Sequence, residues 1–212
     1  MQLFWTPASP FTRKVCIVAR ELELWERIDV LPTTWTLDWG YTTPVFTPGL
    51  AEANPVARIP TLVTDHGVPL GDSTVICLHL ASLGRPDRLI PAEAQLATHM
   101  WSRYAVADGI IEAQIAMRAE LLRPHTQRSD SFLQKQRERI TRCLDTLERD
   151  APHTHAPFDL GAITMAVALG YQDWRDWLFD FRPRCPRLAE WFDVVKGRDS
   201  MRATEPQETP TG

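Results

Sequence analysis

The sequence contains no apolar run that approaches the ~18 residues of a membrane-spanning helix. Its first seven residues also lack the basic segment and the long apolar core of a secretory signal peptide. A net charge of -4 over 212 residues argues against a nucleic-acid-binding surface. These absences exclude a membrane-spanning protein and a nucleic-acid-binding protein, and we expect a cytoplasmic one.

Closely spaced cysteines are absent as well, since no CxxC motif occurs. The four cysteines are widely separated: Cys16, Cys77, Cys143 and Cys185. This spacing predicts buried free thiols in a reducing compartment rather than disulfides or a redox centre. His153 and His155 lie close together, but no further ligand clusters near them, so we expect no metal site.

The composition is that of a globular protein, with 44% apolar and 24% charged residues. In the first part of the chain, apolar residues recur at helical spacing after Pro10, and Ser9 stands where the helix N-cap is expected. The expected elements are strand 2–6, helix 10–23, strand 28–31, loop 32–50, strands 59–64 and 68–70, and helix 72–83. This order is typical of a thioredoxin-like α/β domain.

The remainder of the chain predicts helices alone. Helical patterns cover 92–122, 131–150, 158–171 and 186–197, and the residues after Met201 are expected to form a loose tail. We therefore predict a thioredoxin-like domain at 1–82, a linker at 83–91 and an all-α domain at 92–212.

Three segments of the first domain suit a pocket for an extended acidic peptide. They are Ser9-Pro10-Phe11-Thr12-Arg13-Lys14-Val15, then Asn54-Pro55-Val56-Ala57-Arg58-Ile59-Pro60-Thr61-Leu62, then Gly71-Asp72-Ser73 followed by Ile76. The first and third place polar side chains at helix starts, and the second places an X-Pro bond before a strand. Each segment alone is weak evidence for such a pocket, because the polar side chains of the first and third segments would also serve as ordinary helix caps.

In this order, the segments resemble motifs of the soluble glutathione transferases, and the resemblance covers essentially the whole chain. The second segment resembles the family pattern Asn-Pro-x-x-Lys-Val-Pro-x-Leu, with Arg58 in place of lysine. Residues 168–175 resemble a stretch common in bacterial members. One departure concerns the central helix of the second domain, where Asp159 takes the cap position and Ala162 replaces an inner aspartate.

The resemblance implies an enzyme that binds glutathione as its co-substrate, needs no metal and ionises the thiol. Ser9 is the implied catalytic hydroxyl donor, with Thr6 as the alternative, because a donor at a helix N-terminus favours a thiolate. The alternative interpretation of Ser9 is a plain N-cap. No cysteine lies in the turn, and Cys16 is expected in the core.

The implied glutathione contacts come from the other two segments. A cis Pro60 would leave the main chain of Ile59 free to pair with the cysteinyl backbone of the peptide. Ser73 would bind the γ-glutamyl carboxylate and Asp72 the neighbouring ammonium group. Arg58 either reaches the glycyl carboxylate or is a solvated surface cation.

The sequence leaves open where the acceptor binds and which reaction the protein performs. Candidates for an acceptor pocket are Trp35, Tyr104, Asp108 and Ile111, although ordinary core or dimer packing is the preferred explanation of these residues. The family also implies a homodimer and a detoxification role with a small electrophile or a peroxide as acceptor. A glutathione-dependent isomerase or dehalogenase, or a non-catalytic binding protein, remains an alternative on the same scaffold.

Overall fold

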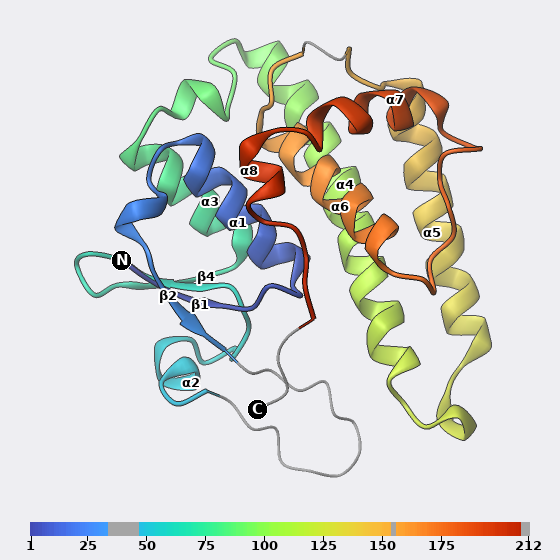
Figure 1. Cartoon of the computed structure of the whole chain (residues 1–212), viewed down its shortest axis with the longest axis horizontal. Helices are drawn as coiled ribbons and strands as arrows, with labels where there is room; N and C mark the ends of the chain where they lie inside the picture. The colour runs from blue at the N-terminus through green and yellow to red at the C-terminus, as the bar shows by residue number, and fades with distance from the viewer. Residues whose placement is uncertain (34–46, 154–155, 209–212) are drawn as a thin grey trace. The chain divides into compact units, whose positions relative to one another are not determined.

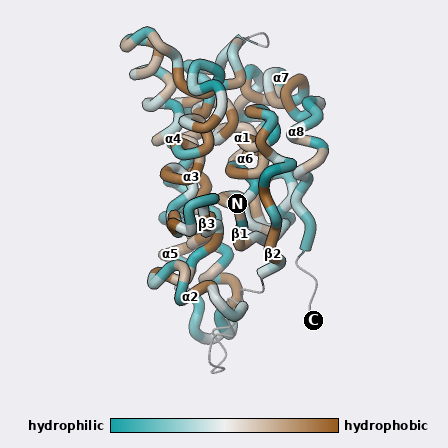
Figure 2. The backbone as a smooth tube through the Cα atoms, turned by 90° about the vertical axis from the view of Figure 1, so that its left-hand side faces the viewer, coloured by the Kyte–Doolittle hydropathy of each residue, from teal (hydrophilic) through white to brown (hydrophobic). Residues whose placement is uncertain are grey.

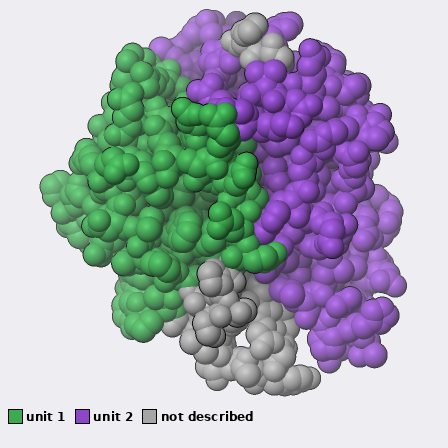
Figure 3. All heavy atoms as spheres, in the orientation of Figure 1, with its two compact units in different colours: residues 1–36, 44–89, 199–212 green, residues 37–43, 90–198 purple. Residues whose placement is uncertain are grey.

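The computed structural model describes residues 1–33, 47–153 and 156–208 (Figure 1). These residues divide into two compact units, shown in different colours in Figure 3. The first unit contains residues 1–33, 47–89 and 199–208, and the second contains residues 90–153 and 156–198. The division therefore groups the last described segment of the chain with the first unit.

The first unit is a thioredoxin-like α/β structure, as the sequence predicted. Its elements are β1 (Gln2–Trp5), α1 (Pro10–Glu21), β2 (Asp29–Pro32), α2 (Leu50–Ala53), β3 (Thr61–Val63), β4 (Pro69–Gly71), α3 (Ser73–Leu83) and α8 (Asp199–Arg202), with short 3-10 helices η1 (Trp25–Arg27) and η2 (Pro86–Arg88). The strand order is β2-β1-β3-β4, in which β1 is parallel to β2 and antiparallel to β3. β3 and β4 form an antiparallel hairpin at one side.

The core of this unit lies between the sheet and two helices. α1 and α3 pack against each other on the same side of the sheet (Figure 1). Leu3 of β1 pairs with Leu62 of β3, and both side chains are fully buried. α1 is buried without interruption from Thr12 to Ala19, and Val15 and Val18 are fully buried there. This packing holds the first turns of both helices in place.

The chain departs from the sequence prediction at two short helices, α2 and α8. α2 begins at the end of the segment expected to be a loop, and α8 begins just before the expected tail. α8 itself is fixed on α1, because the Arg13 side chain donates to the carbonyl of Met201 over 3.2 Å. Ser200 in α8 also donates to the Glu21 carboxylate at the end of α1. These contacts fasten the segment to α1.

The second unit is all-helical in its described residues, as predicted. It contains α4 (Ala94–Leu121), the 3-10 helix η3 (His125–Gln127), α5 (Asp130–Arg149), α6 (Leu160–Trp174) and α7 (Pro186–Val195). α4 packs along both α5 and α6. α6 is buried from Leu160 to Gln172 and is largely apolar (Figure 2). Across the described parts of both units, no helix is long and apolar enough to cross a membrane.

The start of α6 shows how the incomplete capping box is replaced. Asp159 accepts from the Ala162 N–H over 2.8 Å, so the side-chain cap is present. Arg103 of α4 donates to the same carboxylate over 2.7 Å. Gly161 permits this close crossing, since a Cβ there would lie 2.7 Å from the Met100 carbonyl oxygen. A contact from another helix therefore supports this helix start.

Candidate functional site

The sheet register brings the three polar segments to one edge of the first unit. Thr61, the first residue of β3, pairs with Phe4 near the end of β1 and with Gly71 at the end of β4. The residues after β1, before β3 and after β4 therefore meet at the same edge, because antiparallel neighbours run in opposite directions. Five candidate residues lie in these three connections, and Ser73 follows as the first residue of α3; the five are Ser9, Arg58, Ile59, Pro60 and Asp72.

Ser9 is the N-cap of α1. Its Oγ accepts from the Thr12 N–H over 3.2 Å, and its own N–H donates to the Thr6 carbonyl over 3.4 Å. A hydroxyl that accepts one hydrogen bond still has a hydrogen to donate. Within the described residues, no acceptor takes the Ser9 hydrogen. The side chain therefore caps the helix and keeps a free donor at its N-terminus.

Asn54 shapes the loop that enters β3. This buried side chain donates from Nδ2 to the Thr61 Oγ1 over 2.9 Å and to the Arg58 carbonyl over 3.4 Å. Its Oδ1 accepts from the Val56 N–H over 3.0 Å. Sequence reasoning gave Asn54 no role, although its position before Pro55 is a turn signal. It fixes the backbone on both sides of the residue that is expected to contact the peptide.

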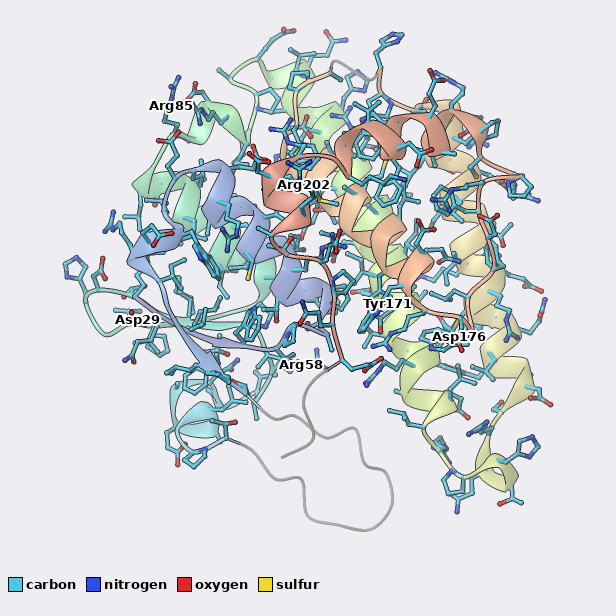
Figure 4. The ribbon with its side chains drawn as sticks, viewed as in Figure 1. Asp29, Arg58, Arg85, Tyr171, Asp176 and Arg202 are labelled. Carbon is cyan, nitrogen blue, oxygen red and sulfur yellow. The ribbon has the colours of Figure 1, made fainter. Side chains whose placement is uncertain are left out.

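The peptide bond between Ile59 and Pro60 is cis, as the family resemblance implied. Neither main-chain group of Ile59 has a hydrogen-bond partner in the described part of the chain. Arg58 is exposed beside it and, within the same residues, forms no ion pair (Figure 4). One unpaired donor, one unpaired acceptor and a cation thus lie next to each other at the sheet edge.

Asp72 and Ser73 begin α3 at the same edge. Asp72 is the N-cap and accepts from the Thr74 and Val75 N–H groups over 2.7 and 3.4 Å. Ser73 is 5% exposed, and neither its hydroxyl nor its N–H has a partner among the described residues. A helix N-terminus with such donors is suited to bind a carboxylate.

Lys14 is a further charged residue near this helix start that the sequence reasoning left without a role. Its side chain is fully buried on α1. Burial acts to raise the pKa of Asp72, but hydrogen bonds from Thr74 and Val75 and the charge of Lys14 hold it below its usual value. Asp72 therefore stays ionised and can attract an ammonium group.

The cysteines do not supply a nucleophile here. Cys16 is 2% exposed, and burial raises the pKa of its thiol to about 12. All four cysteines are free, as the spacing predicted, but only Cys16, Cys77 and Cys185 are buried, and Cys143 is partly exposed. A thiolate at this site must therefore come from a ligand. The described residues also hold no group of three or more His, Cys, Asp or Glu side chains that suits a metal ion.

None of the residues predicted for an acceptor pocket belongs to the described part of the first unit. Trp35 lies outside the described residues. Tyr104, Asp108 and Ile111 lie on α4 in the second unit, where Ile111 is fully buried and Tyr104 is 8% exposed. Tyr104 also makes an edge-to-face contact with Trp101 at 5.5 Å. A role of these residues in acceptor binding stays a prediction.

Comparison with known proteins identifies the family. Residues 8–83 match the model of the glutathione S-transferase N-terminal domain. The chain is 31% identical to the Escherichia coli K12 protein YibF, an uncharacterized GST-like protein, over 97% of this chain and 98% of that one. The chain belongs to the glutathione S-transferase family. Its departure from the usual capping box therefore occurs inside this family.

Solved structures of other family members are similar to this chain over nearly its whole length. A member from Pseudomonas fluorescens Pf-5 with bound glutathione has a TM-score of 0.89 and 33% identity, and the match covers 98% of this chain and 99% of that one. A second, from Methylobacillus flagellatus KT with GSH bound, has a TM-score of 0.82 and 28% identity over 97% and 99% of the two chains. Both support the fold as described.

Proposed function

We propose that this family member binds glutathione at the sheet edge formed by Ser9, Ile59 and Ser73 and activates its thiol as a thiolate. The thiolate would attack a small electrophile or a peroxide. Two similar structures contain bound glutathione, which supports the choice of ligand. The unpaired donors and acceptor at this edge support the choice of site.

The unpaired groups match the groups of the tripeptide one by one. The Ser73 hydroxyl and N–H are offered to the γ-glutamyl carboxylate, and the ionised Asp72 to its ammonium group. The Ile59 N–H and carbonyl are offered to the cysteinyl main chain. Arg58 is the cation nearest in sequence to Ile59 for the glycyl carboxylate.

The free hydrogen of Ser9 carries the catalytic part of the proposal. A free thiol has a pKa of about 8.5, so it is mostly protonated at neutral pH. A hydroxyl donor binds the thiolate more strongly than the thiol, and the N-terminus of α1 favours the anion as well. Both effects act at the position of Ser9, because this residue caps the N-terminus of α1 and its hydroxyl still has a hydrogen to donate.

The test is the titration of bound glutathione, followed by thiolate absorbance against pH. Ser9→Ala should raise the pKa of the bound thiol and largely keep the affinity for the peptide. The loss of turnover should shrink as pH rises toward ~9, where solvent ionises the thiol anyway. Ser129→Ala is a matched control, since Ser129 caps α5 with a similar 3.2 Å bond outside the site.

Thr6→Ala tests the alternative donor. If Thr6→Ala raises the pKa of the bound thiol and Ser9→Ala does not, the donor is Thr6. If neither variant moves it although glutathione binds, the protein is a binding module or uses glutathione without ionising it. Assays with electrophiles, hydroperoxides and cis-enoic acids then distinguish transferase, peroxidase and isomerase activities. We further propose a cytoplasmic location, which the four free thiols support.

A further inference from the structure

Thr61 places a buried hydroxyl next to the main chain that is proposed to contact the cysteinyl part of glutathione. It is the first residue of β3, where it pairs with Phe4 of β1 and with Gly71 of β4, and its side chain is fully buried. Along the chain it follows Ile59 and Pro60 directly. The family pattern leaves this position open, so the hydroxyl is a feature of this chain and not of the motif.

The Thr61 hydroxyl makes one hydrogen bond as a donor and one as an acceptor. It donates to the Arg58 carbonyl over 2.7 Å and accepts from Asn54 Nδ2 over 2.9 Å. The orientation of the Asn54 amide is fixed independently, because its Oδ1 accepts from the Val56 N–H over 3.0 Å. Since the amide supplies the hydrogen of one bond, the hydrogen of the hydroxyl itself points at the Arg58 carbonyl.

These bonds orient the peptide unit between Arg58 and Ile59. A peptide unit is planar, and in a trans unit the C=O and N–H groups point in opposite directions. This unit is trans, and the Arg58 carbonyl is held toward Thr61 and Asn54. The Ile59 N–H therefore points away from both side chains, and it has no partner within the described residues.

The buried pair of Asn54 and Thr61 also lies against the connection after β4. A Cβ at Gly71 would lie 3.0 Å from Asn54 Nδ2, so the amide is in direct contact with the last residue of β4. Gly71 is followed by Asp72 and Ser73, the residues proposed for the γ-glutamyl group. The pair thus joins the two connections that would hold the cysteinyl and γ-glutamyl parts of the peptide. Because Thr61 is fully buried, a ligand at the sheet edge does not touch its hydroxyl.

We propose that Thr61 is a positioning residue for glutathione, whose hydroxyl holds the Arg58 carbonyl inward and so directs the Ile59 N–H at the cysteinyl carbonyl of the peptide. This inference rests on the proposed function, since it concerns how the same peptide is bound. The free protein already holds the donor in the bound orientation, so binding does not have to order this peptide unit. Without the hydroxyl, the Arg58 carbonyl keeps only the 3.4 Å bond from Asn54, and the Ile59 N–H is free to turn.

The test is calorimetric titration of the full-length chain and of Thr61→Val with three ligands. Glutathione and γ-glutamylcysteine both present an oxygen at the cysteinyl carbonyl carbon, whereas γ-glutamylcysteamine lacks this group. Thr61→Val should weaken the first two ligands about three- to tenfold, the effect of one lost hydrogen bond, and change the third less than about twofold. Such a comparison of variants across ligands isolates the coupling between the hydroxyl and the carbonyl. Thr61→Ser keeps the hydroxyl and should bind all three ligands as the wild type does.

Thr164→Val is the matched control. Thr164 is equally buried, and its hydroxyl donates to the Leu160 carbonyl over the same distance of 2.7 Å, in the second unit. Its loss should leave the affinity for all three ligands unchanged. Thr61→Ala removes the same hydroxyl as Thr61→Val and takes its place if the valine variant does not fold.

The outcomes separate this inference from the proposed function. Equal weakening of all three ligands by Thr61→Val would overturn the inference, because the hydroxyl would then only support the fold. Wild-type affinity of Thr61→Val for glutathione, in a chain whose binding Ser73→Ala does weaken, would overturn it while the proposed function stands. Absence of glutathione binding to the wild-type chain would overturn both.

Discussion

The hydroxyl of Ser73 offers the sharpest test of the glutathione site. Its side chain is 5% exposed and makes no hydrogen bond within the described residues, so Ser73→Ala removes no contact of the folded chain. The α3 cap remains, because Asp72 supplies it. Any loss of affinity would therefore come from the missing contact with the ligand. A hydrogen bond to a charged group contributes about 1.5–3 kcal/mol, which corresponds to roughly 10- to 150-fold in Kd.

The assay is calorimetric titration with glutathione, accompanied by thermal unfolding without ligand. Ser73→Ala should weaken binding by that factor and leave the unfolding temperature unchanged. Ser82→Ala is the matched control, because Ser82 lies on the same helix and donates to the His79 carbonyl. A glutathione analogue with its γ-glutamyl carboxylate converted to an amide completes a double-mutant cycle. The effect of Ser73→Ala should be much smaller with this analogue.

Two results would refute the reasoning. If glutathione affinity changes less than twofold in Ser73→Ala, the γ-glutamyl carboxylate is not bound at the start of α3. If the loss is equally large with the amide analogue, Ser73 acts by holding the helix start and not through the carboxylate. Either result would move the peptide to another part of the sheet edge.

The remaining predictions concern the caps, the helix crossing and the assembly. Asp72→Ala should weaken glutathione binding by calorimetry and also lower stability by about 0.5–2 kcal/mol, since it removes a cap. The pKa of Asp72 is lowered in the folded state, so its contribution to the free energy of unfolding should be fully present above the unfolded pKa of about 3.9 and lost as pH falls through the folded pKa. Chemical unfolding of the wild type and of Asp72→Asn measures this contribution. A difference in stability between the two proteins that persists in strong acid would contradict the prediction. Gly161→Ala should destabilise by about 1–3 kcal/mol in thermal unfolding, since the new Cβ would lie 2.7 Å from a carbonyl oxygen. Gly109→Ala should instead stabilise by about 0.5–1 kcal/mol, because in this helix the new Cβ meets only the end of a flexible side chain at 3.4 Å. Light scattering should give the mass of a homodimer, and a single-subunit mass would refute the assembly that the family implies.

Local chemistry made much of the fold predictable. The helix starts at Pro10 and Ser73 follow from a serine or aspartate cap beside a periodic apolar segment, which is information within a few residues. Strand and helix order followed from the same periodicity, and short elements such as α2 and α8 were missed because four residues carry no clear period. The three motifs were predicted to line one pocket, and the structure brings them to one edge of the sheet.

The sequence by itself determined which residues begin helices, the order of strands and helices, and the motifs that indicate the family. These features depend on residues that are close together along the chain. Only the tertiary structure decided that Asn54 fastens the loop before Pro60, that Lys14 is buried near Asp72, and that α8 packs on α1. Each of these contacts joins residues from separate elements or loops. Their partners are selected by burial and by the register of the sheet, because most buried polar groups find a hydrogen-bond partner in space rather than along the chain.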